Sequence, residues 1–268
     1  MTGVEYWREL GLNWLEAPRQ RLWRAFHDRA VADWVLAGLP PDARRLLKTD
    51  LFEEAVGEPL LELLANRVEL AIGVDLSLPL ANAGKRRSPD ADVVGSDVLR
   101  LPIADHSLDV VVSTSTLDHF ERLEELERSL REVGRVLRPG GSLLLTLDNL
   151  DNPVVRLRNR LVRSRVRAFG LVPYRVGATV GRRKLRGMLR EAGFSVERMG
   201  AVVHPLRAVA IPLCERAEHR WSPTARRRLL RFLAAWDRVG RLPTRYLSGY
   251  YLAVVARRLP APERVVRN

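Results

Sequence analysis

The sequence predicts an α/β protein in which a mostly parallel sheet carries helices on both faces. Short apolar runs alternate with amphipathic helical patterns from residue 44 onward, and 46% of the 268 residues are hydrophobic, enough for a sizeable core. Strands that alternate with helices imply right-handed crossovers, which place the strands in parallel. We expect a single domain over residues 1–268.

The first forty residues predict two helices ahead of the sheet. Apolar residues such as Trp7, Leu10 and Trp14 recur at helical spacing, and Pro18 separates the two patterns. Their aromatic side chains are packing residues in one interpretation and a lid over a substrate in the other. We expect residues 1–40 to form a helical extension.

Residues 44–149 carry the strand pattern of the predicted core. The expected strands are 44–49, 70–74, 92–97, 108–113 and 142–147. The runs at 70–74 and 92–97 are typical of strands buried on both faces, and 108–113 has the strongest β signal because it is rich in valine.

Helix signals lie between these strands. Asp50 to Glu53 has the pattern of a capping box that opens a helix through about Asn66. A charged amphipathic helix is expected over 123–137, where Pro139-Gly140-Gly141 would stop it.

Basic residues are concentrated in the C-terminal half. Residues 1–150 hold 18 basic and 25 acidic residues, residues 151–268 hold 27 and 7, and the net charge is +13. This asymmetry indicates an acidic partner, an anionic substrate or a membrane surface near the C-terminal part. Residues 150–184 are predicted to cap the site, and 185–268 to complete the sheet around a helical insertion. The arginine-rich helix 226–236 either lies on an anionic bilayer or docks on the domain with a solvated arginine face.

Composition excludes several classes of protein. The single cysteine, Cys214, excludes an intramolecular disulfide framework and a multi-cysteine metal site, and we expect no metal. No run approaches eighteen uncharged apolar residues, and charges from Glu5 onward leave no room for a signal peptide. We therefore expect a cytoplasmic protein.

Polar residues follow the ends of the predicted strands, where ligands bind in sheets of this kind. They are Lys48, Thr49, Asp50, Asp75, Asp97, Ser113, Thr114, Asp148 and Asn149. Carboxylates at these ends accept hydrogen bonds from ribose hydroxyls and an adenine amino group, and they favour a nearby cation. Without a histidine or cysteine companion, they indicate a nucleoside cradle rather than a metal site.

The stretch from Gly73 to Asn149 resembles the class I S-adenosylmethionine-dependent methyltransferases, most closely the type 11 group. The motifs that carry the resemblance are Gly73-Val74-Asp75-Leu76-Ser77, Ser96-Asp97-Val98, residues 101–111 and residues 131–141. Residues 185–194 are similar to the family's last helix, and 249–257 to its final strand. The resemblance implies a Rossmann-like fold, S-adenosylmethionine as cofactor, and methyl transfer to a small-molecule or glycan-like acceptor that could be anionic.

The same resemblance implies roles for the strand-end residues. Asp75, followed by Leu76, would hold the ribose hydroxyls; Asp97 with Val98 would hold the adenine. Ser113 and Thr114 would flank the methionine part. Asp75 could instead be a solvated strand-end carboxylate or helix cap, and Asp97 could simply cap the following turn.

The first motif departs from the family pattern. The family usually places a glycine-rich loop after the first strand, whereas the first glycine here is Gly57. Either Thr49 and Asp50 contact the methionine part, with Lys48 near its carboxylate, or cofactor binding is weakened. Asp50 could also serve purely as a helix N-cap.

His119 follows the strongest predicted strand and is the candidate catalytic residue. An imidazole there could accept a proton from a hydroxyl nucleophile. In the other interpretation, His119 packs against the cofactor or caps the next helix.

Two other functions stay open. The missing glycine loop would suit a non-catalytic protein with this fold and a degenerate cofactor loop. The basic half would suit a nucleic-acid methyltransferase, but the arginine-rich stretches show no recognisable RNA-binding module and no aromatic stacking platform, so no nucleic-acid partner is expected.

Overall fold

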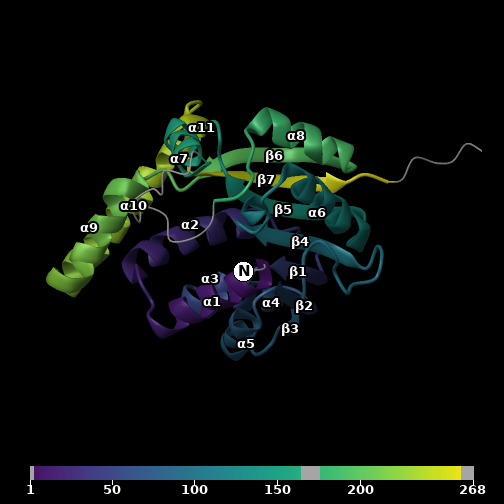
Figure 1. Cartoon of the computed structure of the whole chain (residues 1–268), viewed down its shortest axis with the longest axis horizontal. Helices are drawn as coiled ribbons and strands as arrows, with labels where there is room; N and C mark the ends of the chain where they lie inside the picture. The colour runs from purple at the N-terminus through teal and green to yellow at the C-terminus, as the bar shows by residue number, and fades with distance from the viewer. Residues whose placement is uncertain (1–2, 164–175, 261–268) are drawn as a thin grey trace, which may run out of the picture.

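The computed structural model describes residues 3–163 and 176–260, and a seven-stranded sheet forms its centre (Figure 1). The strand order is β3-β2-β1-β4-β5-β7-β6; β7 runs antiparallel to both of its neighbours, and the other pairs are parallel. The predicted mostly parallel α/β sheet is therefore confirmed. The strands are β1 (Arg45–Thr49), β2 (Leu70–Asp75), β3 (Asp92–Gly95), β4 (Leu108–Thr114), β5 (Leu137–Asp148), β6 (Phe194–Val202) and β7 (Tyr251–Arg258).

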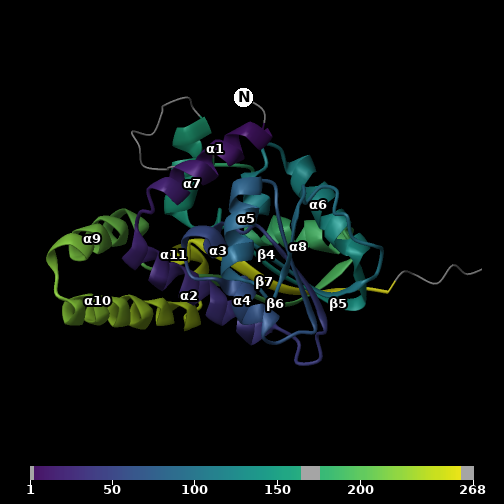
Figure 2. The ribbon, with the colours of Figure 1, turned by 90° about the horizontal axis from the view of Figure 1, so that it is seen from below.

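Helices cover both faces of the sheet, and α9 with α10 extends beyond one end of it (Figures 1 and 2). The helices are α1 (Gly3–Glu16), α2 (Arg21–Gly38), α3 (Phe52–Val56), α4 (Leu60–Ala65), α5 (Leu78–Arg87), α6 (Leu123–Val136), α7 (Pro153–Arg163), α8 (Arg182–Glu191), α9 (Arg207–Arg220), α10 (Pro223–Trp236) and α11 (Arg245–Ser248), with 3₁₀ turns η1 (Leu117–His119) and η2 (Asp237–Arg241). Helices α1 and α2 form the predicted N-terminal extension, and α9 to α11 form the predicted insertion before the last strand.

None of the helices in the described residues is long and apolar enough to cross a membrane.

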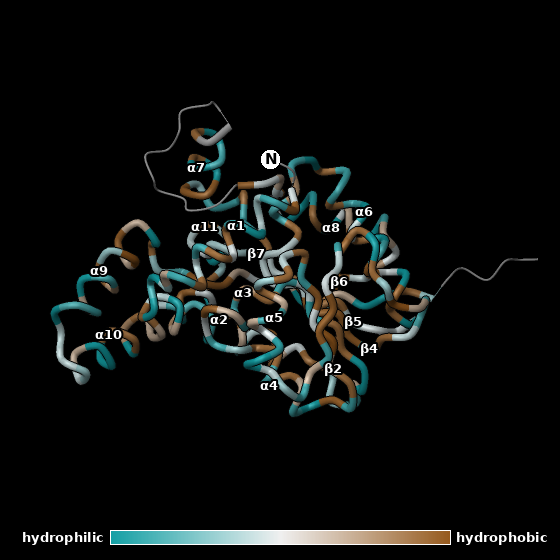
Figure 3. Tube along the Cα trace, turned by 60° about the horizontal axis from the view of Figure 1, so that its bottom comes forward, coloured by the Kyte–Doolittle hydropathy of each residue, from teal (hydrophilic) through white to brown (hydrophobic). Residues whose placement is uncertain are grey.

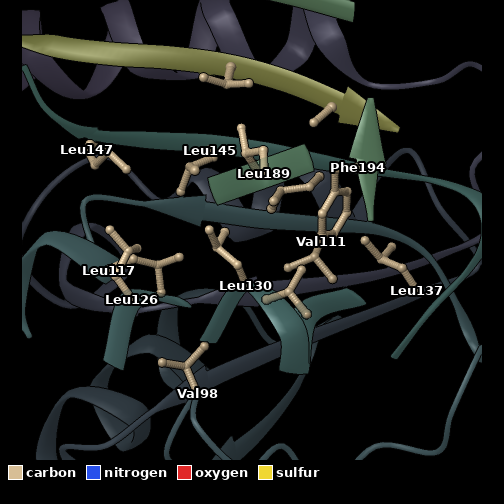
Figure 4. Packing of buried hydrophobic residues seen from close by; sticks show 14 of the residues in the cluster. Val98, Val111, Leu117, Leu126, Leu130, Leu137, Leu145, Leu147, Leu189 and Phe194 are labelled. Atoms are coloured by element: carbon tan, nitrogen blue, oxygen red, sulfur yellow. The ribbon is translucent and has the colours of Figure 1, made fainter. Parts of the chain in front are cut away.

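Successive residues of the central strands point to opposite faces and so build two separate cores. Leu47 and Val111 pack with α6 and α8, whereas their neighbours Leu46 and Val110 pack with α2, α4, α9 and α10. Figure 4 shows the first core, where Leu130 of α6 and Leu189 of α8 lie against the sheet. The strands are accordingly the most hydrophobic part of the trace (Figure 3). Each fully buried leucine stabilises the fold by roughly 1.5–3 kcal/mol.

Two strands differ from their sequence predictions. The run at 92–97 is not buried on both faces: β3 is the edge strand, and its Asp92 and Val94 are exposed. The Pro139-Gly140-Gly141 segment does not separate helix from strand, because β5 already begins at Leu137. Leu137 pairs with Leu108, and the register shifts before Val110, so the glycine-containing segment forms an irregularity inside β5.

The chain after β1 differs from the predicted capping box. The amide of Asp50 donates to the carbonyl oxygen of Val74, so it is not bonded to Glu53, whose carboxylate binds Lys48 instead. Gly57 and Pro59 divide the predicted single helix into α3 and α4, because the residue before a proline avoids the helical region and proline lacks an amide hydrogen.

A buried ion cluster fixes α3 over the end of β1. Lys48 is fully buried, and its Nζ donates to Glu53 Oε2 and Glu54 Oε2, both at 3.0 Å, and to the carbonyl oxygen of Asp50. Glu54 also accepts from the amide of Leu61 at 2.8 Å. Burial alone would lower the pKa of Lys48, but the carboxylates of Glu53, Glu54 and Asp50 outweigh it and raise that pKa. The cluster thereby joins the carboxyl end of β1 to α3 and α4.

Replacing the central lysine should destabilise the protein strongly. A Lys48→Met variant leaves the Glu53 and Glu54 carboxyl groups buried without their counter-charge, and we expect a loss of about 3–5 kcal/mol in the free energy of unfolding, measured by urea denaturation. The matched control is Arg29→Ala, which breaks the exposed Arg29–Asp33 pair and should cost less than about 0.5 kcal/mol. Equal losses in the two variants would contradict a stabilising role for the cluster.

Candidate functional site

A cavity of about 210 Å³ lies beyond the carboxyl ends of β1, β2, β4 and β5. Register places these ends together, since Thr49 pairs with both Val74 and Ser113, and Thr114 pairs with Thr146. The cavity is far larger than the roughly 10–15 Å³ that one water needs. It can therefore hold a ligand with several functional groups.

Eight of the ten residues predicted to form the site line this cavity. They are Thr49, Asp50, Asp75, Leu76, Asp97, Val98, Thr114 and His119. The remaining two, Lys48 and Ser113, are fully buried behind its wall. Lys48 is held by the ion cluster, and Ser113 Oγ accepts a hydrogen bond from Thr49 Oγ1 at 2.9 Å. The structure therefore gives these two residues positioning roles and does not bring them to the ligand space.

The turn after β1 takes at Asp50 the backbone conformation that glycine favours. Asp50 has a φ of 67°, in the left-handed region that aspartate tolerates better than most residues. Its Oδ1 accepts from the amide of Phe52 at 2.8 Å, which stabilises the turn locally. In place of a glycine-rich loop, the structure therefore has a tight turn with Asp50 at its apex, and Asp50 lines the cavity.

Asp75 joins this turn to the one that follows β2. Its Oδ2 accepts from the amide of Leu51 at 2.8 Å, and its Oδ1 accepts from the amide of Ser77 at 2.7 Å. Asp75 is thus both a capping carboxylate and a cavity-lining residue. Burial raises its pKa, and the two backbone hydrogen bonds offset part of that rise.

The loop after β3 supplies a polar and an apolar contact side by side. Asp97 is exposed and accepts from the amide of Leu99 at 2.9 Å, so it caps its turn as well as lining the cavity. Val98, the next residue, is buried within the cavity wall. This pair offers a hydrogen-bond acceptor, Asp97, and an apolar contact, Val98, to one end of a ligand.

Helices α1 and α2 close the cavity with aromatic side chains. Trp7 and Trp14 of α1 and Trp23 of α2 line it. The Trp7 ring lies 4.7 Å from the His119 ring, and Trp14 lies 5.3 Å from Phe52, centroid to centroid. The sequence left open whether these aromatic residues pack within the protein or cover the site. In the structure they pack against other side chains and also line the cavity.

Of the predicted cap, the described residues 150–163 and 176–184 do not line the cavity. Two of its arginines have partners in the domain: Arg158 pairs with Asp148 and Tyr250, and Arg182 pairs with Asp151 at 3.6 Å and lies over the ring of Tyr246. Residues 164–175 of the predicted cap lie outside the described residues. The aromatic residues that cover the cavity come from α1 and α2, near the start of the sequence.

Two buried carboxyl groups lie beside His119. Asp118 Oδ2 accepts from the amide of Asp148 at 2.8 Å, whereas its Oδ1 is buried and finds no hydrogen-bond partner among the described residues. Burial and the nearby Asp148 carboxylate raise the pKa of Asp118 to about 6. Both carboxyl groups line the cavity, so a proton acceptor with a pKa close to neutrality faces the ligand space.

Sequence reasoning missed several residues of the site. Asp118 carried a usable signal, because it precedes His119 at the end of the strongest strand. Arg207 and Tyr251 gave none, since the fold brings them from α9 and β7 to the cavity across more than fifty residues of chain.

The chemistry of the lining suits a positively charged ligand that also carries hydroxyl groups. Burial and the neighbouring carboxylates of Asp75 and Glu53 raise the pKa of Asp50 well above its usual range. A cation placed among these carboxylates would relieve their repulsion. S-adenosylmethionine carries a sulfonium, an ammonium and two ribose hydroxyls, and the residues present fit these groups.

Comparison with known proteins matches part of this chain to methyltransferases. A family model described as "Methyltransferase domain" matches residues 56–145. A demethylmenaquinone methyltransferase of Paenarthrobacter aurescens is 30% identical over 146 residues, which cover 50% of this chain and 55% of that protein. A "Probable S-adenosylmethionine-dependent methyltransferase" of Mycolicibacterium smegmatis is 29% identical over 163 residues, 60% of this chain and 58% of the relative. The chain thus spans about half the length of these curated relatives.

Solved structures share the fold at low identity. A "possible histamine N-methyltransferase" of Thermotoga maritima superposes with a TM-score of 0.57 at 16% identity, covering 87% of this chain and 90% of that one. The N-methyltransferase NodS of Bradyrhizobium japonicum, solved with S-adenosyl-L-homocysteine, has a TM-score of 0.54 at 12% identity over 87% of both chains. Residues 56–145 thus match a methyltransferase-domain family, and the chain shares the fold of solved S-adenosylmethionine-dependent methyltransferases.

Proposed function

We propose that this chain is a cytoplasmic enzyme that transfers the methyl group of S-adenosylmethionine to a small-molecule or glycan acceptor carrying an anionic group. One observation supports this above all others. A single cavity brings strand-end carboxylates suited to a nucleoside, a carboxyl group with a raised pKa, and an aromatic wall to the same edge of the sheet.

The cofactor would occupy the side of the cavity formed by β1, β2 and the loop after β3. Asp75 and Leu76 would hold the ribose, and Asp97 with Val98 would hold the adenine. Thr49, Asp50 and Thr114 would lie along the methionine part. When bound, S-adenosylmethionine supplies a methyl group already activated by its sulfonium. The protein therefore has mainly to align the acceptor and exclude water.

Asp118 and His119 would handle the proton that the acceptor's nucleophile loses. Both lie in η1, directly after β4, and both line the cavity. The packing of Trp7 on His119 orients the imidazole, and the raised pKa of Asp118 suits a carboxylate that takes up a proton near neutrality. In this proposal Asp118 shares the role first assigned to His119.

The acceptor would lie under the aromatic wall. Tryptophan rings bind flat apolar faces, including those of sugars and of aromatic rings. Arg207 lines the same side, where it donates to the Tyr251 hydroxyl at 3.0 Å and lies over the Tyr250 ring at 4.4 Å. A guanidinium held in this way favours an acceptor with a carboxylate or phosphate.

The missing glycine loop is weak support for a non-catalytic protein. Asp50 adopts the left-handed conformation that a glycine would supply, and its carboxylate contributes to the cavity. The loop is thus reshaped rather than lost. A catalytic protein remains the better proposal.

Cofactor binding tests this proposal directly. Wild-type protein should bind S-adenosylmethionine in isothermal titration calorimetry, and Asp75→Asn should bind at least tenfold more weakly, because hydrogen bonds to an ionised acceptor are worth about 1.5–3 kcal/mol each. Asparagine retains one oxygen for the backbone amides, so circular dichroism should show a folded variant. The exposed Asp90→Asn variant is the control and should bind like the wild type. Absence of measurable binding by wild type at sub-millimolar cofactor would refute the proposal.

The pKa of Asp118 predicts a pH-dependent stability difference. Its folded-state pKa of about 6 exceeds the ordinary 3.8, so ionisation of Asp118 destabilises the fold. This cost is absent below about pH 4, grows as pH rises through 6, and is then constant. Asp118→Asn carries no charge at any pH. The variant should match wild type near pH 4 and exceed its free energy of unfolding by up to about 3 kcal/mol at pH 7.

Urea denaturation at pH 4, 5, 6 and 7 measures this difference, with Asp90→Asn as the control at an exposed position. A difference between Asp118→Asn and wild type that does not change with pH would show that Asp118 does not titrate in this range.

A further inference from the structure

The outward face of α7 is an apolar stripe. Val154, Leu157 and Leu161 are 46%, 59% and 42% exposed. Their spacing of three and four residues places them within an arc of about 60° on the helix. Single exposed leucines are common on protein surfaces, but an aligned series on one helix face marks a surface that contacts something apolar.

The inward face of α7 is firmly attached to the domain. Val155 and Asn159 are buried. Arg158 donates to Asp148 and to the Tyr250 hydroxyl, and it lies over the Tyr250 ring at 5.3 Å. At the start of the helix, Asn152 Nδ2 donates to the carbonyl oxygens of Ser248 and Gly249, both at 3.1 Å. The stripe is thus carried by a docked helix, and Asp148 connects it to the wall of the cavity.

Arginines flank the apolar stripe. The sequence of α7 contains four arginines and no acidic residue. Arg156 and Arg160 are exposed, and helical spacing places them on one flank of the stripe, between Leu157 and the buried Asn159. Arg156 Nε donates to the carbonyl oxygen of Leu150, and the guanidinium forms no ion pair with a carboxylate of the described residues. The outward surface of α7 therefore combines exposed apolar side chains with positive charge that no acidic residue of the helix offsets. In the Cα trace of Figure 3, hydrophobic and hydrophilic residues alternate along α7.

We propose that α7 binds the surface of a lipid bilayer that contains anionic headgroups. Leu157 and its two stripe neighbours would enter the boundary between headgroups and acyl chains, while Arg156 and Arg160 would contact headgroup phosphates. An anionic bilayer satisfies both parts of this surface at once. An acidic polypeptide would satisfy the arginines and leave the leucines in water. The proposal does not depend on methyl transfer, and it is tested without cofactor.

This assignment differs from the helix that the sequence suggested for a bilayer, residues 226–236. Those residues form most of α10, whose Leu229 and Leu233 are buried in the core shared with α2. Its exposed aromatic residues, Phe232 and Trp236, contact each other edge to face at 5.7 Å. They provide a matched control, because they are exposed apolar residues beside arginines on a different helix.

Vesicle co-sedimentation tests the proposal with the whole chain. The probes are vesicles of phosphatidylcholine alone and vesicles with one part in four of phosphatidylglycerol, at low and high salt. The compared proteins are wild type, Leu157→Ser/Leu161→Ser, Arg156→Gln/Arg160→Gln and the control Phe232→Ser/Trp236→Ser. Thermal unfolding by circular dichroism confirms that each is folded, which the exposure of the substituted side chains favours.

We expect wild type to bind the phosphatidylglycerol vesicles and not those of phosphatidylcholine alone. The leucine variant should bind at least tenfold more weakly. The arginine variant should bind about thirtyfold more weakly and respond less to salt, since each arginine near the surface contributes about 1 kcal/mol. The control should bind like wild type. Absence of binding to the anionic vesicles, or a loss confined to the α10 control, would overturn the proposal, as would wild-type binding by both α7 variants.

Discussion

The architecture of the site depends on a charge that cannot reach water. Lys48 lies inside the sheet at the end of β1, and burying an ammonium there is tolerable only because Glu53 and Glu54 surround it. Both glutamates belong to α3, so the requirement for charge balance fixes where that helix begins. The position of α3 in turn decides where Asp50 and Phe52 enter the cavity.

Hydrogen bonds to Asp75 connect the turn after β1 with the turn after the neighbouring strand β2. Asp75, at the end of β2, accepts amide hydrogens from the turn after β1 and from its own turn, so two neighbouring loops are held by one carboxylate. The same residue is the expected ribose contact. In the proposed function, one carboxylate would therefore both position the loops and bind the ribose, and its hydrogen bonds to the loops are already formed without a ligand. Such preorganisation reduces the entropy lost on binding.

The strand-end residues were predictable because parallel strands bring their carboxyl ends to one edge whatever the loops do. The strand pattern alone was enough to predict that Asp75 and Asp97 lie at this edge of the sheet. The aromatic wall could not be located in this way, since Trp7 meets His119 only when α1 docks across the chain. The partners of the basic residues were equally unpredictable: Arg158, within the predicted cap, forms an ion pair with Asp148 of β5. Local pattern shows that a residue is charged, but not which partner the fold provides.

The strand order also governs how the chain can assemble. Among the described strands, β6 pairs with β7 alone, and β7, which lies between β6 and β5, is the last of these strands to be synthesised. Until then, the β1 to β5 layer presents an open hydrogen-bonding edge at β5, and β6 has no partner. The α9–α10 insertion lengthens this interval by delaying β7. Completion of the sheet is therefore a late, non-local event in synthesis, when unpaired strand edges are exposed to other chains.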